Sequence, residues 1–257
     1  MASVVVPGIW RLEGTRGSNV YVRQAPNGQL VLIDTGFASS VEAIEHELGS
    51  LGLGPLSMVL LTHAHPDHTG AAARVRALTG APLAIGIGDA ARRGGGWRLE
   101  MATRSGPISR LLRPLLRRRL PPLPNIDRVL DGEVEVAPGL LAVPTPGHTP
   151  GSYCFLDTTR GVAFVGDLVI SHHDGLARSL KFANSDDMQY LATMRVFAER
   201  APAIGCCGHG EPVLDNFGEQ LRTLAALPRR SATSPAVLLW RARRLFAFAR
   251  GISKPRR

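Results

Sequence analysis

Cysteine, aromatic side chains and long apolar runs are all scarce in this chain, and each shortage excludes a class of protein. Three of the 257 residues are cysteine and none forms a CxxC pair, so we expect no disulfide framework. No apolar run is long enough to cross a bilayer, and residues 1–10 lack the basic start and apolar core of a secretory signal. These absences predict a cytoplasmic protein.

Two motifs that indicate other catalytic chemistries are also absent. The chain has neither a GxSxG turn for a serine nucleophile nor a phosphate-binding glycine loop. Its length and its hydrophobic content of 44% suit a single α/β domain with a substantial core. We predict this domain over residues 1–228, with a basic insertion at 92–124 and a basic C-terminal helix and tail at 229–257.

The most informative segment reads THAHPDHTG and follows a short apolar run. His63 and His65 project to the same side of an extended chain, where two neutral imidazoles can bind one metal ion. Pro66 ends the strand, so Asp67 and His68 can turn toward a second position beside the first. This spacing predicts a pair of metal ions.

Three further metal-binding side chains stand at the ends of predicted strands. His148 follows the apolar run that ends at Val143, Asp167 follows the run VAFVG, and His209 follows the run that ends at Cys207. Each histidine has a glycine before it, which opens the backbone for close approach to a ligand. We expect these residues to complete the metal site, and we expect Cys207 and its neighbour to fill core positions.

This order of residues resembles the metallo-β-lactamase superfamily, whose ligand pattern is HxHxDH followed by H, D and H. The resemblance covers about residues 4–215. It implies an α/β fold, the four-layer αββα sandwich with two mixed sheets flanked by helices. It also implies that two divalent ions are bound, with His63, His65 and His148 on the first, Asp67, His68 and His209 on the second, and Asp167 bridging both.

The resemblance also implies roles for residues around the metals. Asp34, in the short motif IDTG, is expected to orient a ligand. Asp67 is the expected catalytic residue, which orients the nucleophile and carries a proton to the leaving group. Zinc suits the histidine and carboxylate ligands, and iron or manganese would accept them too. We expect His172, His173 and Tyr153 to line the pocket, with solvent exposure as the alternative for the two histidines.

The function that the resemblance implies is hydrolysis by a metal-bridging hydroxide. TPGHTPGS and the Gly166–Asp167 pair are most similar to the branch that resembles glyoxalase II and lactonases. We therefore expect a small-molecule substrate with an ester, thioester or lactone bond.

Basic residues are concentrated in two segments. Residues 92–120 hold nine arginines against one glutamate, and residues 229–257 hold nine basic residues and no acidic one. Leucines at helical spacing in the first segment predict a lid over the pocket mouth, with its arginines in water. The alternative is that these arginines attract an anionic substrate or contact an anionic membrane surface.

Two other functions stay open at this point. Arginine clusters bind phosphates, so a metal-dependent phosphodiesterase or nuclease is the enzymatic alternative. Nucleic acid is not the partner we expect, because the arginine clusters lack interleaved aromatic side chains that would stack on bases. A membrane-surface or partner-binding module without turnover is the non-enzymatic alternative. The sequence carries no prediction of the oligomeric state.

The hydrophobic pattern predicts elements in an order that suits the sandwich. Ser39 and Glu42 predict a capping box for the first helix, which should end at Gly52. Predicted strands cover 4–6, 20–22, 30–33, 58–61, 82–85, 128–136, 140–143, 153–156, 162–165 and 203–207, and predicted helices cover 41–51, 70–78, a segment from 185 and 216–227.

Overall fold

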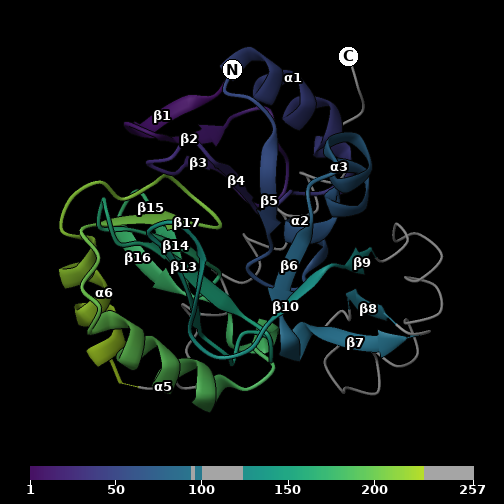
Figure 1. Ribbon diagram of the computed structural model, residues 1–257. Helices are drawn as coiled ribbons and strands as arrows, with labels where there is room; N and C mark the ends of the chain where they lie inside the picture. Colours follow the sequence, from purple (N-terminus) through teal and green to yellow (C-terminus); the bar gives the residue numbers. More distant parts are fainter. Residues whose placement is uncertain (94–95, 100–123, 229–257) are drawn as a thin grey trace. The chain divides into compact units, whose positions relative to one another are not determined.

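The computed structural model describes residues 1–93, 96–99 and 124–228 (Figure 1). Residues 1–225 form one compact unit, and a second unit begins at Ala226. Most of the basic insertion and all of the basic tail lie outside the described residues, so the lid, the arginine contacts and the domain boundaries stay predictions. Within the described ranges, no helix combines the length and the apolar character that a membrane span requires.

The first sheet has seven strands in the order β1-β2-β3-β4-β5-β6-β10. Its first four strands form an antiparallel meander, and the strands from β4 onward pair in parallel. The bounds are β1 Ser3–Val6, β2 Ile9–Leu12, β3 Val20–Gln24, β4 Leu30–Ile33, β5 Leu56–Leu60, β6 Leu83–Gly86 and β10 Arg128–Leu130.

The second sheet has five strands in the order β11-β12-β13-β14-β17, and only β14 and β17 pair in parallel. Its bounds are β11 Val134–Ala137, β12 Leu140–Pro144, β13 Tyr153–Asp157, β14 Val162–Gly166 and β17 Ile204–Cys207. Two smaller sheets accompany it, the hairpin of β15 Val169–His172 and β16 Gly175–Arg178, and the trio of β7 Ala90–Arg93, β8 Gly96–Leu99 and β9 Asn125–Ile126.

The helices cover the outer faces of the two large sheets, which gives four layers (Figure 1). Helices α1 (Val41–Leu51) and α3 (Ala72–Thr79) share a buried cluster with the first sheet, and α5 (Asp187–Ala198) and α6 (Phe217–Ala226) share one with the second. A third cluster lies between the sheets. The predicted αββα sandwich of two mixed sheets is confirmed.

Alternation along the strands explains why both faces of each sheet are apolar. On β14, Val162 and Phe164 join the cluster between the sheets, whereas Ala163 and Val165 face α5 and α6. A strand buried on both faces reads as a continuous apolar run rather than an alternating one. The run VAFVG that precedes Asp167 is such a strand, and its five residues are all buried.

The predicted start of α1 at Val41 is confirmed, but the capping box predicted for it from Ser39 and Glu42 is absent. Ser40 rather than Ser39 precedes the helix, after a single 3-10 turn, and no side chain caps it. The Ser40 hydroxyl is used elsewhere, because it accepts from the Arg16 amide and donates to the Arg16 carbonyl. The predicted end is confirmed, since Gly52 adopts the left-handed conformation with φ of 62°.

One strand prediction also needed correction, and several strands were not predicted. The strand predicted at 128–136 is two strands in different sheets, β10 and β11, separated at a left-handed Gly132. Strand β2, the trio of β7, β8 and β9, and the hairpin of β15 and β16 were not predicted. The helix predicted at 70–78 is preceded by one short turn of helix, α2 (Pro66–Thr69).

A buried ion pair joins the two large sheets. Arg23 on β3 donates from Nε to Asp157 on β13 at 2.9 Å, and both side chains are fully buried. Burial alone would raise the pKa of Asp157, but hydrogen bonds from Arg23 and Thr159 bring it below its ordinary value. The charge on Arg23 is therefore neutralised across the interface between the sheets.

Asp157→Asn should destabilise the fold strongly, because it leaves the Arg23 cation buried without a counter-charge. We expect the free energy of unfolding at pH 7 to fall by about 3–5 kcal/mol in a urea titration. The matched control is Glu133→Gln, which removes the half-exposed ion pair with Arg200 and should cost less than about 1 kcal/mol. Equal losses in the two variants would contradict the role of the buried pair.

The same pair predicts a pH dependence of stability. Because the folded-state pKa of Asp157 is lowered, its contribution is complete above the unfolded pKa of about 3.9 and is lost as the pH falls below that value. Urea titrations between pH 6 and pH 2 should therefore show a steeper loss in the wild type than in Asp157→Asn. Parallel curves would contradict this.

Candidate metal centre

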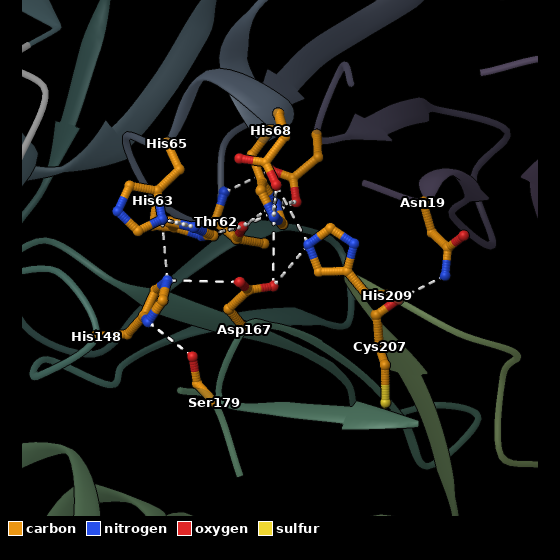
Figure 2. Close-up of polar contacts among 12 residues, drawn as sticks. Asn19, Thr62, His63, His65, His68, His148, Asp167, Ser179, Cys207 and His209 are labelled. Atoms are coloured by element: carbon orange, nitrogen blue, oxygen red, sulfur yellow. Dashed lines mark hydrogen bonds and ion pairs between the residues drawn. The ribbon is translucent and has the colours of Figure 1, made fainter. Parts of the chain in front are cut away.

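The seven predicted ligands lie at the ends of strands from both large sheets. The first sheet supplies the segment after β5, which contains four of them. The second sheet supplies His148 from the turn between β12 and β13, Asp167 directly after β14, and His209 after β17. Figure 2 shows the labelled histidines and Asp167 pointing toward one another.

The two sheets approach each other closely at this point. The Tyr153 amide donates to the Thr62 carbonyl at 2.8 Å, which joins β13 to the segment after β5. Gly166, the last residue of β14, has φ of 48°, and a Cβ there would lie 2.8 Å from the Thr62 hydroxyl. Glycine is therefore required for β14 to end against the loop that carries His63.

The first group of donors is His63, His65, His148 and Asp167, whose ligand atoms lie within 4.8 Å of one another. Nδ1 of His65 lies 3.0 Å from Nε2 of His63 and 3.0 Å from Nε2 of His148. Nε2 of His148 lies 3.5 Å from Oδ2 of Asp167. Three imidazoles and one carboxylate thus surround one position that an ion can occupy.

The second group is Asp67, His68 and His209. Nε2 of His209 lies 3.3 Å from Oδ2 of Asp67 and 3.3 Å from Oδ1 of Asp167. Nε2 of His68 lies 3.3 Å from the same Asp167 oxygen. Asp167 therefore directs one oxygen toward each group.

Two atoms at the centre lack the hydrogen bonds that burial demands. Nε2 of His68 and Oδ1 of Asp167 are buried, and neither makes a hydrogen bond within the described part of the chain. Buried polar atoms are normally hydrogen-bonded. Two buried atoms that face each other without a hydrogen bond therefore indicate a missing partner. A divalent cation satisfies an imidazole nitrogen and a carboxylate oxygen together, and the donor set fits one.

Burial keeps His63 and His65 of the first group neutral, as metal ligands must be. Burial and the neighbouring imidazoles hold the pKa of His63 well below its ordinary value. For His65, burial and His148 lower the pKa to about 4. Both rings therefore present lone pairs at neutral pH.

Asp34 organises the segment after β5. It has φ of 60°, and its carboxylate accepts from the Thr62 amide and the Thr62 hydroxyl, each at 2.8 Å. The same carboxylate lies 2.7 Å from Nδ1 of His68. Burial would lower the pKa of His68, but Asp34, together with Asp167 and Asp67, raises it well above its ordinary value. With Nδ1 held by Asp34, His68 turns Nε2 toward the second group.

His148 has its own support, which sequence reasoning missed. Its Nδ1 lies 3.0 Å from Oδ1 of Asn184 and 3.2 Å from the Ser179 hydroxyl. Asn184 donates in turn to Asp187 at 2.9 Å. Because the amide oxygen accepts from Nδ1, the lone pair of His148 lies on Nε2, which faces Asp167.

The His209 loop is tied to the first sheet by Asn19 and Tyr21. Nδ2 of Asn19 donates to the carbonyls of Cys207 and Gly210 at 3.0 and 2.6 Å, and the Tyr21 hydroxyl donates to the Cys207 carbonyl at 2.9 Å. Figure 2 shows the Asn19 contact beside His209. The only signal in the sequence was the position of Asn19 directly before the strand VYVRQ, which contains Tyr21.

The three residues predicted to line the pocket, Tyr153, His172 and His173, differ in burial. Tyr153 is buried in the cluster between the sheets and donates to the Gly132 carbonyl, which leaves almost none of it to line a cavity. His172 is exposed, and His173 pairs with Asp174 in the turn of the β15–β16 hairpin. The choice between a pocket-lining and a solvent role for these two histidines stays a prediction. The cysteine pair before His209 is buried, as predicted.

Several relatives share most of this chain. YobT of Bacillus subtilis is 30% identical over 75% of this chain and 83% of its own length. Thioesterase pkgB of Emericella nidulans is 28% identical over 81% of this chain. A hydroxyacylglutathione hydrolase of Cereibacter sphaeroides is 27% identical over 73% of it. The chain spans 49% of the length of pkgB and 60% of the hydrolase.

Solved structures share the fold. A metallo-β-lactamase family protein of Thermus thermophilus superposes with a TM-score of 0.62 over 98% of this chain and 85% of its own, at 22% identity. Fold, donor set and relatives together define a metal-dependent hydrolase. The family model of the metallo-beta-lactamase superfamily matches residues 14–209, which is more than half of the chain. The chain therefore belongs to the metallo-β-lactamase superfamily.

Asp34→Asn should weaken the second group selectively, because it removes the carboxylate that orients His68. We expect metal affinity there to fall by about 10–100-fold, with the first group little changed. Competition with a chromophoric chelator measures both affinities. Asp127→Asn, which alters a partly exposed carboxylate paired with Arg76, is the control and should bind metal as the wild type does. Equal affinities in both variants would contradict the assignment.

Proposed function

We propose that this protein hydrolyses an ester, thioester or lactone bond of a small molecule at a centre of two divalent metal ions. The observation that carries the proposal is the pair of donor groups that share Asp167, with Oδ2 near His148 and Oδ1 near His68 and His209. A carboxylate placed between two sets of imidazoles suits a bridging ligand.

The proposed ligands follow from the two groups. His63, His65 and His148 would hold the first ion, Asp67, His68 and His209 the second, and Asp167 both. Imidazole and carboxylate donors without a thiolate favour zinc, and iron or manganese take the same donors. When bound, the ions supply a water that ionises at neutral pH and a positive charge that polarises the carbonyl oxygen.

Asp67 is the proposed catalytic residue. Burial would raise its pKa, but His68 and His209 lower it to about 2, so the carboxylate is ionised at neutral pH. An ionised carboxylate can accept a hydrogen bond from the attacking water and so orient its lone pair toward the carbonyl carbon. In hydrolysis the water oxygen bonds to that carbon, the bond to the leaving group breaks, and Asp67 passes the proton of the water to the leaving group.

Relatives favour a thioester within this substrate class. The relative pkgB is named a thioesterase and the Cereibacter protein a hydroxyacylglutathione hydrolase, and both match most of this chain. Because the chain spans only part of those proteins, we carry over the reacting bond and not the rest of either substrate. The nuclease and membrane-surface alternatives rest on arginines that lie mainly outside the described residues, and no described contact favours them.

Metal content and turnover should be lost together. Purified protein should contain two metal ions per chain and hydrolyse members of a panel of esters, thioesters and lactones, with β-lactams and phosphodiesters as comparison. Dialysis against a chelator should abolish turnover, and zinc should restore it. Asp67→Ala should lower kcat by about 10²–10⁴-fold.

His63→Ala should lose metal as measured by elemental analysis, because it removes one donor of the first group. His46→Ala, an exposed histidine on α1, is the matched control and should keep both metal and activity. Turnover of phosphodiesters alone would replace the proposed bond class, and full activity in metal-free protein would overturn the proposal.

A further inference from the structure

Asp89 is a fully buried carboxylate that is absent from both donor groups, yet it contacts the two loops that supply three of their histidines. It ends the 3-10 turn η2 (Ile87–Asp89), which directly follows β6. Sequence reasoning gave it no role, because a single acid after Gly-Ile-Gly matches no ligand pattern.

The contacts of Asp89 reach one loop from each sheet. Oδ2 accepts from the amide of Ala64, the residue between His63 and His65, at 2.8 Å. The same oxygen accepts from the hydroxyl of Thr149, the residue after His148, at 2.6 Å.

The other carboxylate oxygen of Asp89 accepts a hydrogen bond from the same loop as Thr149. Oδ1 accepts from the Gly151 amide at 2.9 Å. Ser152 completes the loop, because its hydroxyl accepts from the Thr149 amide at 2.9 Å and lies 2.7 Å from the Thr149 hydroxyl.

The backbone packs tightly where these contacts form. A Cβ at Gly86 would collide with the Gly151 carbonyl, and a Cβ at Gly88 would collide with Pro150. Two glycines therefore let the segment before Asp89 lie directly against the His148 loop. Such contact between backbones leaves little freedom for one loop to shift relative to the other.

The hydrogen-bond donors around residue 89 favour a carboxylate over a neutral side chain. All three groups that face Asp89 are donors, two amides and one hydroxyl, and they divide between its two oxygens. An asparagine would turn its NH₂ group toward one of these donors and lose that bond. Burial raises the pKa of Asp89 and so disfavours its charged form, and the three donors offset this effect in part.

We propose that Asp89 is a positioning residue of the metal centre, whose carboxylate sets the distance between the His63–His65 turn and the His148 loop. The inference rests on the proposed function, since it assigns the three histidines to one ion. It goes further by naming the group that holds them in register across the two sheets.

Cobalt(II) titration of the metal-free full chain tests the proposal, because the visible absorption of bound cobalt reports ligand geometry independently of turnover. The variants are Asp89→Asn, Thr149→Val and Thr149→Ser. The matched control is Glu47→Gln, which alters another buried carboxylate that accepts from two amides, those of Glu13 and Gly14, and touches no ligand loop.

We expect Asp89→Asn to lower cobalt affinity at the first position by about tenfold or more and to shift its absorption bands. Thr149→Val should show a smaller change of the same kind, and Thr149→Ser, which keeps the hydroxyl, should restore the wild-type spectrum. Glu47→Gln should lower the midpoint of thermal unfolding and leave affinity and spectrum unchanged. If Asp89→Asn does not fold, the two Thr149 variants carry the test.

Two results would overturn the inference in distinguishable ways. Wild-type affinity and spectrum in both Asp89→Asn and Thr149→Val, with stability lowered as in the control, would show that Asp89 only supports the fold, while the proposed function stands. A wild-type protein that binds no cobalt would overturn the proposed function itself, and the role of Asp89 with it.

Discussion

The convergence of imidazole lone pairs is the arrangement on which the rest of the structure depends. Nitrogen atoms of His63 and His148, which are both buried, each lie 3.0 Å from Nδ1 of the partly buried His65. Neutral rings that aim lone pairs at one point repel each other unless a cation stands between them. The fold must therefore hold these rings by their outer atoms. His148 is held through Asn184, and His68, in the neighbouring group, through Asp34.

Two further sets of contacts hold the loops that carry the donors, one near each donor group. The contacts of Asp89 join the His63–His65 turn to the His148 loop. On the other side, residues at the start of β3 reach both the Asp67 turn and the His209 loop, because the Ser18 amide donates to the Asp67 carbonyl and Asn19 donates to the Cys207 carbonyl. Each set links the first sheet to the second. Each donor group thus has supporting contacts of its own, and Asp167 has one oxygen near each group.

The ligand segments could be predicted from the sequence. The residues that support the ligands could not, for identifiable reasons. The ligand segments were found because each combines a donor with the end of an apolar run, as at Asp167 after VAFVG. The supports were missed because Asn184 lies 36 residues from the histidine that it holds, and no local pattern marks such a pair. The capping box at Ser39 failed for a related reason, since the hydroxyl of the next serine bonds to Arg16, a partner 24 residues away. The break at Gly132, by contrast, was visible as an Asp-Gly turn.

The donors come from both sheets, and the space between the sheets is filled by side chains. Tyr21 and Phe164 pack there with ring centroids 5.5 Å apart, on strands that lead to the Asn19 support and to Asp167. Protein interiors are packed to crystal-like density, so the bulk of these rings fixes how far apart the sheets stand. The thickness of the hydrophobic layer therefore sets the span across the metal centre. Substitutions deep in that layer, remote from any ligand, are a route by which this fold can adjust the reactivity of its centre.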